Sequence, residues 1–282
     1  MGDHKIPGRG VLTQLLLLAI SILLPILVLM PWEQWFSGSV ELAAAYAPLG
    51  SAAHPLGTDN LGRDLLVRVS SAVKSSVLPL WLSAVGAGLL GVMTGLFVCS
   101  RRYSLGVGRI FSMLGSIPLF LLVFAASVFF ERTGLWVFVL PLIFFLSIRF
   151  FNVIQLSYLR DAKKAYWTAG QAVGADRSEL IWRYGISSAW LPLLVHELAF
   201  SMAVVVSIEG ALSYLGLGVA EPTASFGNML SSHFDDYLRG RMWVLVVVAS
   251  AFILTLSWPF VLLTVAKKYF WTPADTSSTL SH

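Results

Sequence analysis

Residues 209–229, EGALSYLGLGVAEPTASFGNM, decide the fold of this chain. An apolar helical segment that carries one carboxylate, Glu209, runs directly into a loop. Gly216 and Gly218 permit tight backbone turns there, and Pro222 prevents the helix from continuing. A charge at the centre of a membrane-spanning helix costs about 2.5–3.5 kcal/mol, so this acid should face a bundle interior, a partner helix or water. We interpret it as a structural hydrogen-bonding acid in preference to a contact with a solute.

The composition indicates a membrane protein. Of 282 residues, 57% are hydrophobic and 12% are charged, with a mean hydropathy of +0.78. Soluble domains carry about 25% charged residues, so the excess apolar surface should face lipid. The net charge of +4 does not indicate nucleic acid, because the basic residues cluster between apolar runs. The one cysteine, Cys99, excludes an internal disulfide.

Six apolar segments are long enough to span a bilayer as helices, which predicts an all-α polytopic membrane protein. They cover 11–30, 78–99, 110–130, 135–151, 191–215 and 242–266. The first is longer than the apolar core of a signal peptide, so we expect a retained helix rather than a cleaved leader. Pro118, Pro141 and Pro259 fall inside predicted spans, where neighbouring helices must satisfy the freed carbonyls; this implies a packed bundle.

The distribution of Lys and Arg predicts the topology. With the N-terminus in the cytoplasm and six alternating spans, thirteen basic residues lie inside and six outside. This favours cytoplasmic N- and C-termini, with loops 31–77 and 216–241 outside and 152–190 inside. We divide the chain into a first helix and outer loop (1–76), a membrane domain (77–270) that includes an inner loop at 158–188, and a C-terminal tail (271–282).

The inner loop is polar but rich in helix-forming residues, and Gly174 should divide it into two short helices. A helix–glycine–helix element can fit a groove on a partner protein, with small residues permitting close approach. A solvated amphipathic connector explains the same composition, and the residues alone leave both interpretations open.

The segment 54–64, HPLGTDNLGRD, should precede a helix just outside the membrane. Its glycines indicate turns, and Asp59, Arg63 and Asp64 are suited to capping and pairing at a helix start. A metal site built from His54 and the two aspartates has no supporting ligand spacing, so we expect no metal. The motif residues are His54, Gly57, Asp59, Gly62, Arg63 and Asp64.

These segments together resemble the C-type permease subunit of the dipeptide/oligopeptide/nickel ABC importers. The 54–64 motif is similar to a hallmark of that subunit. The 209–229 stretch resembles the family pattern Glu-x-x-Leu-Ser-Phe-Leu-Gly-Leu-Gly followed by Pro, Trp-Gly and Met. Tyr214 here replaces Phe, and Phe226 precedes Gly227 where Trp is common. The likeness covers about residues 54–270.

The inner loop resembles the EAA loop of ABC importer permeases in spacing more than in side chains. The positions that the resemblance assigns to coupling with the ATPase are Ala169, Gly170, Gly174, Ala175 and Asp176. Thr168 stands where the family has Glu, and Gly170 where it has a second Ala. Ser187–Ser188 stands where a Pro-Asn pair is usual.

The resemblance implies a type I ABC importer permease fold in a bacterial inner membrane. Its implied partners are a B-type permease subunit forming a heterodimer, two ABC ATPase subunits, an extracytoplasmic solute-binding protein and membrane lipid. The chain has no GxxxxGK[ST] phosphate loop and no catalytic motif, so it should not be an enzyme and should bind no cofactor. ATP and Mg²⁺ would bind the partner ATPases. The implied cargo is a dipeptide, an oligopeptide, nickel or a metal–chelator complex.

Two other classes compete with this interpretation. A proton-coupled secondary transporter would use Glu209, but such proteins usually contain internal repeats and discontinuous helices, which the sequence does not show. An intramembrane enzyme or a scaffold would work without ATPases, and no catalytic motif supports the enzyme.

Overall fold

The computed structural model describes residues 30–36, 39–101, 104–130, 135–183 and 190–270. Within these ranges all regular elements are helical, and one isolated bridge joins Thr58 to Asp64. In chain order they are η1 (Trp32–Gln34), η2 (Leu42–Ala44), α2 (Leu65–Ala72), the π-helical η3 (Val73–Val77), α3 (Leu78–Ser100), α4 (Ser104–Leu114), α5 (Leu119–Phe129), α6 (Leu135–Asp161), α7 (Ala165–Ala172), α8 (Arg177–Leu180), α9 (Leu191–Tyr214), α10 (Phe226–Ser232), α11 (Phe234–Leu238) and α12 (Met242–Phe270).

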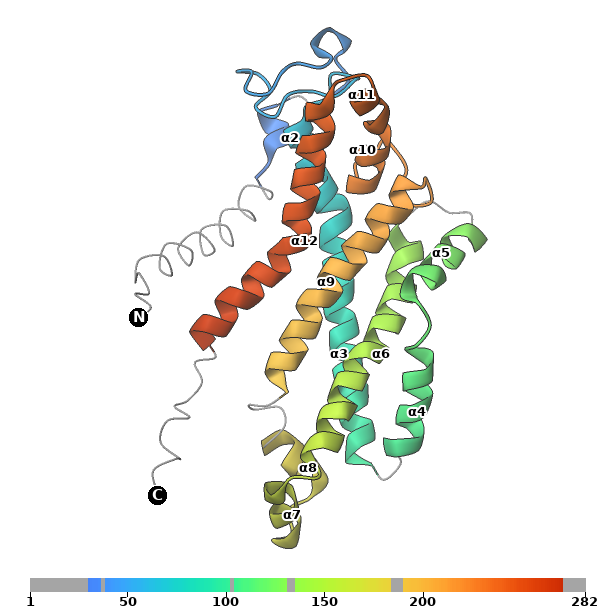
Figure 1. Ribbon diagram of the computed structural model, residues 1–282, viewed down its shortest axis with the longest axis vertical. Coiled ribbons are helices and arrows are strands. Elements are labelled where there is room, and N and C mark those ends of the chain that lie inside the picture. The colour runs from blue at the N-terminus through green and yellow to red at the C-terminus, as the bar shows by residue number, and fades with distance from the viewer. Residues whose placement is uncertain (1–29, 37–38, 102–103, 131–134, 184–189, 271–282) are drawn as a thin grey trace, which may run out of the picture.

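The long helices form a membrane bundle, as the apolar segments predict. Four described helical segments are long and apolar enough to cross a bilayer, and the bent pair α4–α5 makes a fifth if it counts as one span. The predicted first span, 11–30, lies outside the described residues except for Met30, and the tail, 271–282, lies outside them entirely. Figure 1 shows α3, α6 and α9 running alongside one another, with α12 against α9. The all-α polytopic fold is confirmed.

The third predicted span, 110–130, is not one continuous helix. The axis bends by 65° between α4 and α5, and Pro118 is the N-cap of α5 with extended backbone (φ −62°, ψ 116°). Proline has no N–H to donate and restricts the residue before it, so the first helix ends there. Pro118 therefore does not lie inside a helix, whereas Pro141 and Pro259 do lie inside α6 and α12.

The fourth predicted span, 135–151, is shorter than the helix that contains it, because α6 continues to Asp161. Ile154 and Tyr158, one helical turn apart, are both buried and pack in a second core cluster with Cys99 at the end of α3. This packing on one face keeps the polar-looking segment 152–161 helical.

Helices α3 and α6 share the most extensive helix–helix contact of the described residues, and two glycines allow their close approach. A Cβ built at Gly91 would lie 2.6 Å from Cβ of Phe150 and would overlap the carbonyl of Ser147. A Cβ at Gly95 would lie 2.9 Å from Cβ of Ile154. This Gly-x-x-x-Gly pair therefore brings the backbones of the two helices together, as small residues do in membrane bundles.

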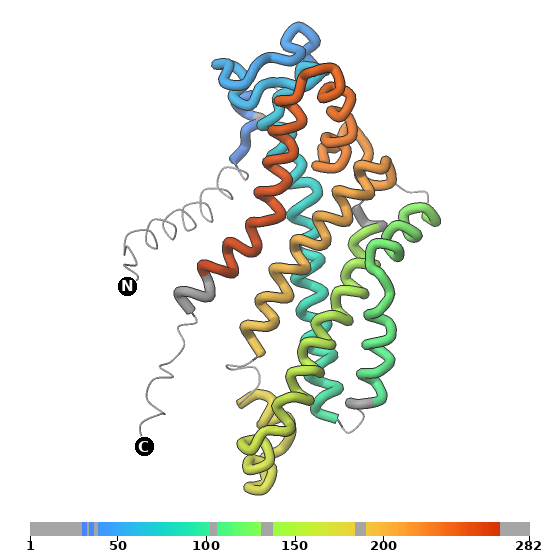
Figure 2. Tube along the Cα trace, in the orientation of Figure 1, coloured from blue at the N-terminus to red at the C-terminus, as the bar shows by residue number. Residues whose placement is uncertain are grey.

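The bundle has two distinct ends. Loop 39–64, α2, α10 and α11 gather at one end, which we call the α2 end (Figure 2). The helices α7 and α8 lie at the other, the α8 end. The described parts of the connections 31–77 and 216–241 thus share one end, and residues 162–183 lie at the opposite one, which is the relative arrangement expected from the basic residues.

Candidate functional site

Gly174 separates the two short helices at the α8 end. Its φ is +94°, a conformation in which a residue with a Cβ is strained. The turn is closed by two backbone hydrogen bonds: Gly174 N–H donates to the carbonyl of Gln171 at 3.0 Å, and Ala175 N–H donates to that of Gly170 at 3.1 Å. The helix–glycine–helix element expected from the sequence is therefore formed.

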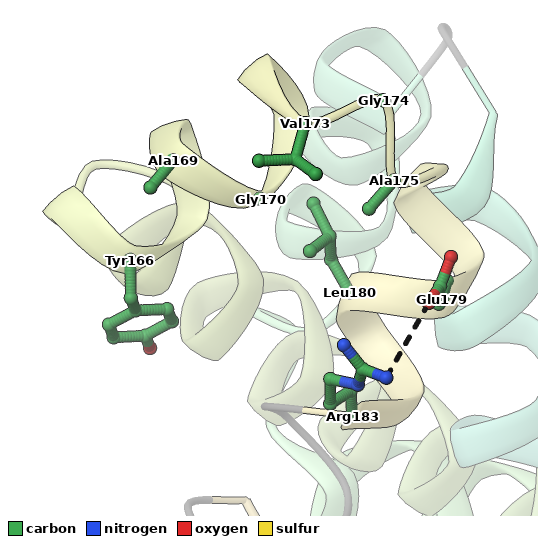
Figure 3. A pocket seen from close by; sticks show the side chains of 9 residues that line it. All are labelled: Tyr166, Ala169, Gly170, Val173, Gly174, Ala175, Glu179, Leu180 and Arg183. Atoms are coloured by element: carbon green, nitrogen blue, oxygen red, sulfur yellow. Dashed lines mark ion pairs between the residues drawn. The ribbon is translucent and has the colours of Figure 1, made fainter.

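A groove of about 510 Å³ lies between α7 and α8 (Figure 3). Leu180 lines it and is almost fully buried, and a Cβ on Gly170 would lie 2.5 Å from a methyl carbon of that leucine. At the side of the groove, Glu179 and Arg183 form an exposed ion pair at 3.9 Å. The lining residues are Tyr166, Ala169, Gly170, Val173, Gly174, Ala175, Glu179, Leu180 and Arg183. The small side chains create the hollow.

Two exposed apolar residues belong to the same element, and the sequence analysis did not single them out. Val173 is 90% exposed, and Trp182 is 72% exposed. Exposed apolar groups of this kind, tryptophan above all, are typical of surfaces that bind another protein. The available signal was that both apolar residues stand in an otherwise polar loop, Val173 directly before the helix-breaking Gly174.

The helix pair is anchored to the bundle through Asp161 at the end of α6. The indole N–H of Trp190 donates to Asp161 Oδ2 at 2.7 Å, and both residues are fully buried. The Lys164 ammonium lies 2.9 Å from Asp161 Oδ1, and this hydrogen bond raises the pKa of Lys164 above its usual value. Trp190 directly precedes α9, so this contact joins both ends of the loop that carries α7 and α8.

Two polar side chains of the α7–α8 element form hydrogen bonds within that element. Asp176 is the N-cap residue of α8, and a hydrogen bond from the Ser178 hydroxyl at 2.6 Å lowers the pKa of the Asp176 carboxyl. Thr168, which stands where the resembled family has Glu, donates to the carbonyl of Ala165 at 2.9 Å. It supplies no negative charge to a partner. Ser187–Ser188 lies outside the described residues.

At the α2 end, Asp59 organises the 54–64 motif. It is fully buried and accepts hydrogen bonds from the backbone N–H groups of Leu61 (2.9 Å) and Arg63 (2.8 Å). The Arg63 Nε also donates to it at 2.6 Å. The pairing expected between these two charged residues is confirmed. Gly57 and Gly62 adopt positive φ angles of 76° and 74°, which shape the turns.

Asp64 caps α2, as expected. Its side chain accepts from the N–H groups of Leu66 at 2.8 Å and Val67 at 3.2 Å, and His54 Nδ1 lies 2.9 Å from its other oxygen. The described residues contain no group of three or more His, Cys, Asp and Glu side chains placed to hold a metal ion.

The two strongest sequence motifs meet in space. Glu221, in the loop after α9, lies 3.4 Å from Arg63 Nη1 and 3.3 Å from Arg68 Nη2. The two arginines are 7% and 5% exposed, whereas the Glu221 side chain is 43% exposed. The sequence analysis singled out neither Arg68 nor Glu221, because nothing local connects positions more than 150 residues apart.

Glu209 joins α9 to the loop that follows it. The acid is 1% exposed, and the Ser213 hydroxyl donates to its Oε1 at 2.6 Å. The same hydroxyl oxygen accepts from Val219 N–H at 3.0 Å. Among the described residues, Glu209 Oε2 has no hydrogen-bond partner. The acid therefore points into the bundle as expected, and the Ser213 hydroxyl that it accepts from belongs to its own helix.

The glycines of the 209–229 motif allow its loop to fold back on α9. A Cβ on Gly218 would lie 2.6 Å from Cα of Ser213, and one on Gly227 would lie 2.6 Å from Cβ of the same serine. Gly216 has a φ of +77°, and Pro222 follows a cis peptide bond. Gly216, Gly218 and Pro222 therefore lie in this loop, and Gly227 lies in the first turn of α10, which packs against α9.

A capping box that the sequence analysis missed holds this loop. Ser225 Oγ accepts from Asn228 N–H at 3.2 Å, and Asn228 Oδ1 accepts from Ser225 N–H at 3.0 Å. The Asn228 amide also donates to the carbonyls of Val219 (3.1 Å) and Thr223 (2.8 Å). The signal was the polar pair three residues apart in SFGN, although the usual capping box has Glu or Gln at the second position.

No protein-family model matches this chain. Curated relatives do match. The chain is 30% identical to the oligopeptide transport system permease protein OppC of Bacillus subtilis over 231 residues, which cover 81% of this chain and 73% of the relative. It is 31% identical to the di/tripeptide transport system permease protein DppC of Pseudomonas aeruginosa over 199 residues, covering 69% and 64%.

Proposed function

Because this chain belongs to the family of peptide transport system permease proteins, we propose that it is the membrane permease subunit of an ATP-driven peptide importer. The chain is a multi-pass protein of the bacterial inner membrane, and its relatives are transport subunits, which disfavours the proton-coupled alternative. The relatives are named as peptide transport proteins, which supports a peptide as the cargo. Their names do not support nickel or a metal–chelator complex. The proposed partners are a B-type permease, two ATPases that bind ATP and Mg²⁺, and a solute-binding protein.

The structural observation that carries this proposal is the α7–α8 groove, which exposed Val173 lines, together with exposed Trp182 two residues after α8. We place the α8 end in the cytoplasm together with both termini, in line with the positive-inside count. The partner ATPases can then bind this element from the cytoplasm. The α2 end faces outward, where a solute-binding protein would deliver the peptide.

The structure offers a direct path from the α8 end to the α2 end. The Asp161–Trp190 hydrogen bond ties the end of α6, from which the α7–α8 element follows, to the start of α9. Helix α9 has 24 residues and is therefore roughly 36 Å long, about the thickness of a bilayer core. Its far end carries Glu209 and the loop whose Glu221 contacts the arginines near α2. A displacement of α7–α8 would thus reach the outer surface through one helix.

Copurification from membranes tests this proposal, with a matched pair of substitutions. Val173→Asp places a charge on the exposed surface of the α7–α8 element and leaves the core intact. Val40→Asp is the control, because it makes the same change at a 58% exposed valine of the α2 end. We expect the wild-type chain to bring down a second permease and an ATPase subunit, and its cells to take up radiolabelled trialanine. The Val173 variant should lose the ATPase, and the Val40 variant should keep it. Recovery of the chain alone, or an intact complex with the Val173 variant, would contradict the proposal.

A further inference from the structure

Of the two buried arginines at the α2 end, Arg63 has a close carboxylate partner and Arg68 does not. Asp59 lies 2.6 Å from Arg63 Nε but 3.9 Å from Arg68 Nε, which is too far for a hydrogen bond. Among the described residues Arg68 Nε has no hydrogen-bond partner at all, although this residue is only 5% exposed. The remaining contact of Arg68 is the 3.3 Å approach of the half-exposed Glu221. This buried cation is therefore compensated by the Asp59 charge 3.9 Å from Nε and by one long hydrogen bond to a carboxylate that water can reach.

Other acids near this site are already engaged. Asp59 accepts three hydrogen bonds from the 59–63 turn. Asp64 is occupied by the N-terminus of α2 and by His54. Glu221 is thus the carboxylate of this cluster with the fewest fixed contacts, and its departure would leave the two arginines opposite a single aspartate.

A groove opens directly beside Arg68. It has a volume of about 330 Å³ and runs between the α2–η3 segment and residues 222–224. Arg68, Ser71 and Ser75 line one side, and the residues that directly follow Glu221 line the other. Its lining therefore combines an arginine with two serines, and the Ser75 hydroxyl donates across the groove to the carbonyl of Ala224 at 3.0 Å. A cationic residue in a partly polar lining suits an anionic ligand.

We propose that Arg68 and this groove bind the terminal carboxylate of a short peptide, which takes the place of Glu221 on the guanidinium. Glu221 acts as an internal substitute that keeps the buried charge compensated while the groove is empty. A guanidinium binds carboxylates through parallel N–H groups, so an incoming carboxylate can form shorter and better aligned bonds than the present 3.3 Å contact. The choice of a peptide as ligand rests on the proposed function, whereas the carboxylate chemistry rests on the geometry.

Ligand-observed NMR titration of the full-length chain in lipid nanodiscs tests this inference, with trialanine and trialanine amide as the two probes. We expect the free acid to bind at least tenfold more tightly than the amide, and Arg68→Gln to abolish this preference. Glu221→Gln should tighten trialanine binding about fivefold, because it removes the internal competitor at a cost typical of a partly exposed ion pair. Asp235→Asn, at an exposed acid of α11 that lies outside both the groove and the arginine cluster, is the control and should change nothing.

Equal binding of acid and amide would overturn the inference, and so would weaker binding by the Glu221 variant. If Arg68→Gln does not fold, as judged by size-exclusion chromatography, two measurements still test the inference. They are the comparison of trialanine with its amide on the wild-type chain and the affinity of the Glu221 variant for trialanine. If the wild-type chain binds the free acid selectively but supports no peptide uptake and brings down no ATPase, the proposed function alone is overturned. Intact uptake without carboxylate selectivity would overturn only the site.

Discussion

Substitution of Gly91 by alanine tests the close packing of α3 on α6. The added methyl carbon would lie 2.6 Å from Cβ of Phe150 and would overlap a backbone carbonyl of α6, which cannot rotate away. Carbon atoms pack best at about 3.5–4.0 Å, so the helices must move apart by about 1 Å. Gly86 is the matched control, because it lies in the same helix and its Cβ would meet nothing within 4 Å.

The expected magnitude follows from two opposing terms. Alanine favours a helix over glycine by about 0.5–1 kcal/mol, and both variants gain this. Overpacking costs about 1–3 kcal/mol, and only Gly91→Ala suffers it. We therefore expect the free energy of unfolding to fall by about 1–2 kcal/mol for Gly91→Ala and to stay level or rise slightly for Gly86→Ala.

Unfolding of the purified chain in mixed micelles with increasing denaturing detergent, followed by tryptophan fluorescence, measures the difference. The reasoning predicts that the two alanine variants separate in midpoint, with the Gly91 variant lower. Equal midpoints, or a Gly91 variant more stable than wild type, would show that α3 and α6 do not approach as closely as described.

Three further predictions concern the two ends of the bundle. Asp59→Ala removes the 2.6 Å partner of buried Arg63 and should lower the free energy of unfolding by about 3–5 kcal/mol in the same titration; a loss below 1 kcal/mol would contradict the pairing. Trp190→Phe keeps the aromatic ring but loses the hydrogen bond to Asp161. It should cost about 1.5–3 kcal/mol and speed amide hydrogen exchange in α7 and α8, and unchanged exchange would refute the anchoring role. Gly174→Ala forces an L-residue to a φ of +94° at a cost of about 1–2 kcal/mol and should reduce ATPase copurification. Full recovery of the ATPase would contradict a role of this turn in ATPase binding.

Part of the fold follows from the sequence because the responsible forces act over short distances. The apolar length of 191–215 and 242–266 predicts α9 and α12, since a helix must satisfy its own backbone in lipid. Gly174 predicts the break between α7 and α8, and Asp64 predicts the start of α2, because turns and caps involve neighbouring residues. The bend at Pro118 carried the same kind of signal, but the apolar run around it concealed the break.

The candidate site at the α2 end is different. Its composition was visible in two motifs, yet Glu221 reaches Arg63 and Arg68 only because α9 returns the chain to the end where α2 begins. The Asp161–Trp190 contact depends in the same way on how α6 and α9 meet.

The sequence by itself therefore determined that this protein is a helical membrane permease, where most of its spans lie, and which glycine and aspartate end or begin a helix. Only the tertiary structure decided that α3 pairs with α6 and that two distant motifs share one ion-pair cluster. The physical reason is range: hydrophobic length, capping and backbone conformation act within a few residues, whereas charge pairing depends on which helix ends the packed bundle brings together.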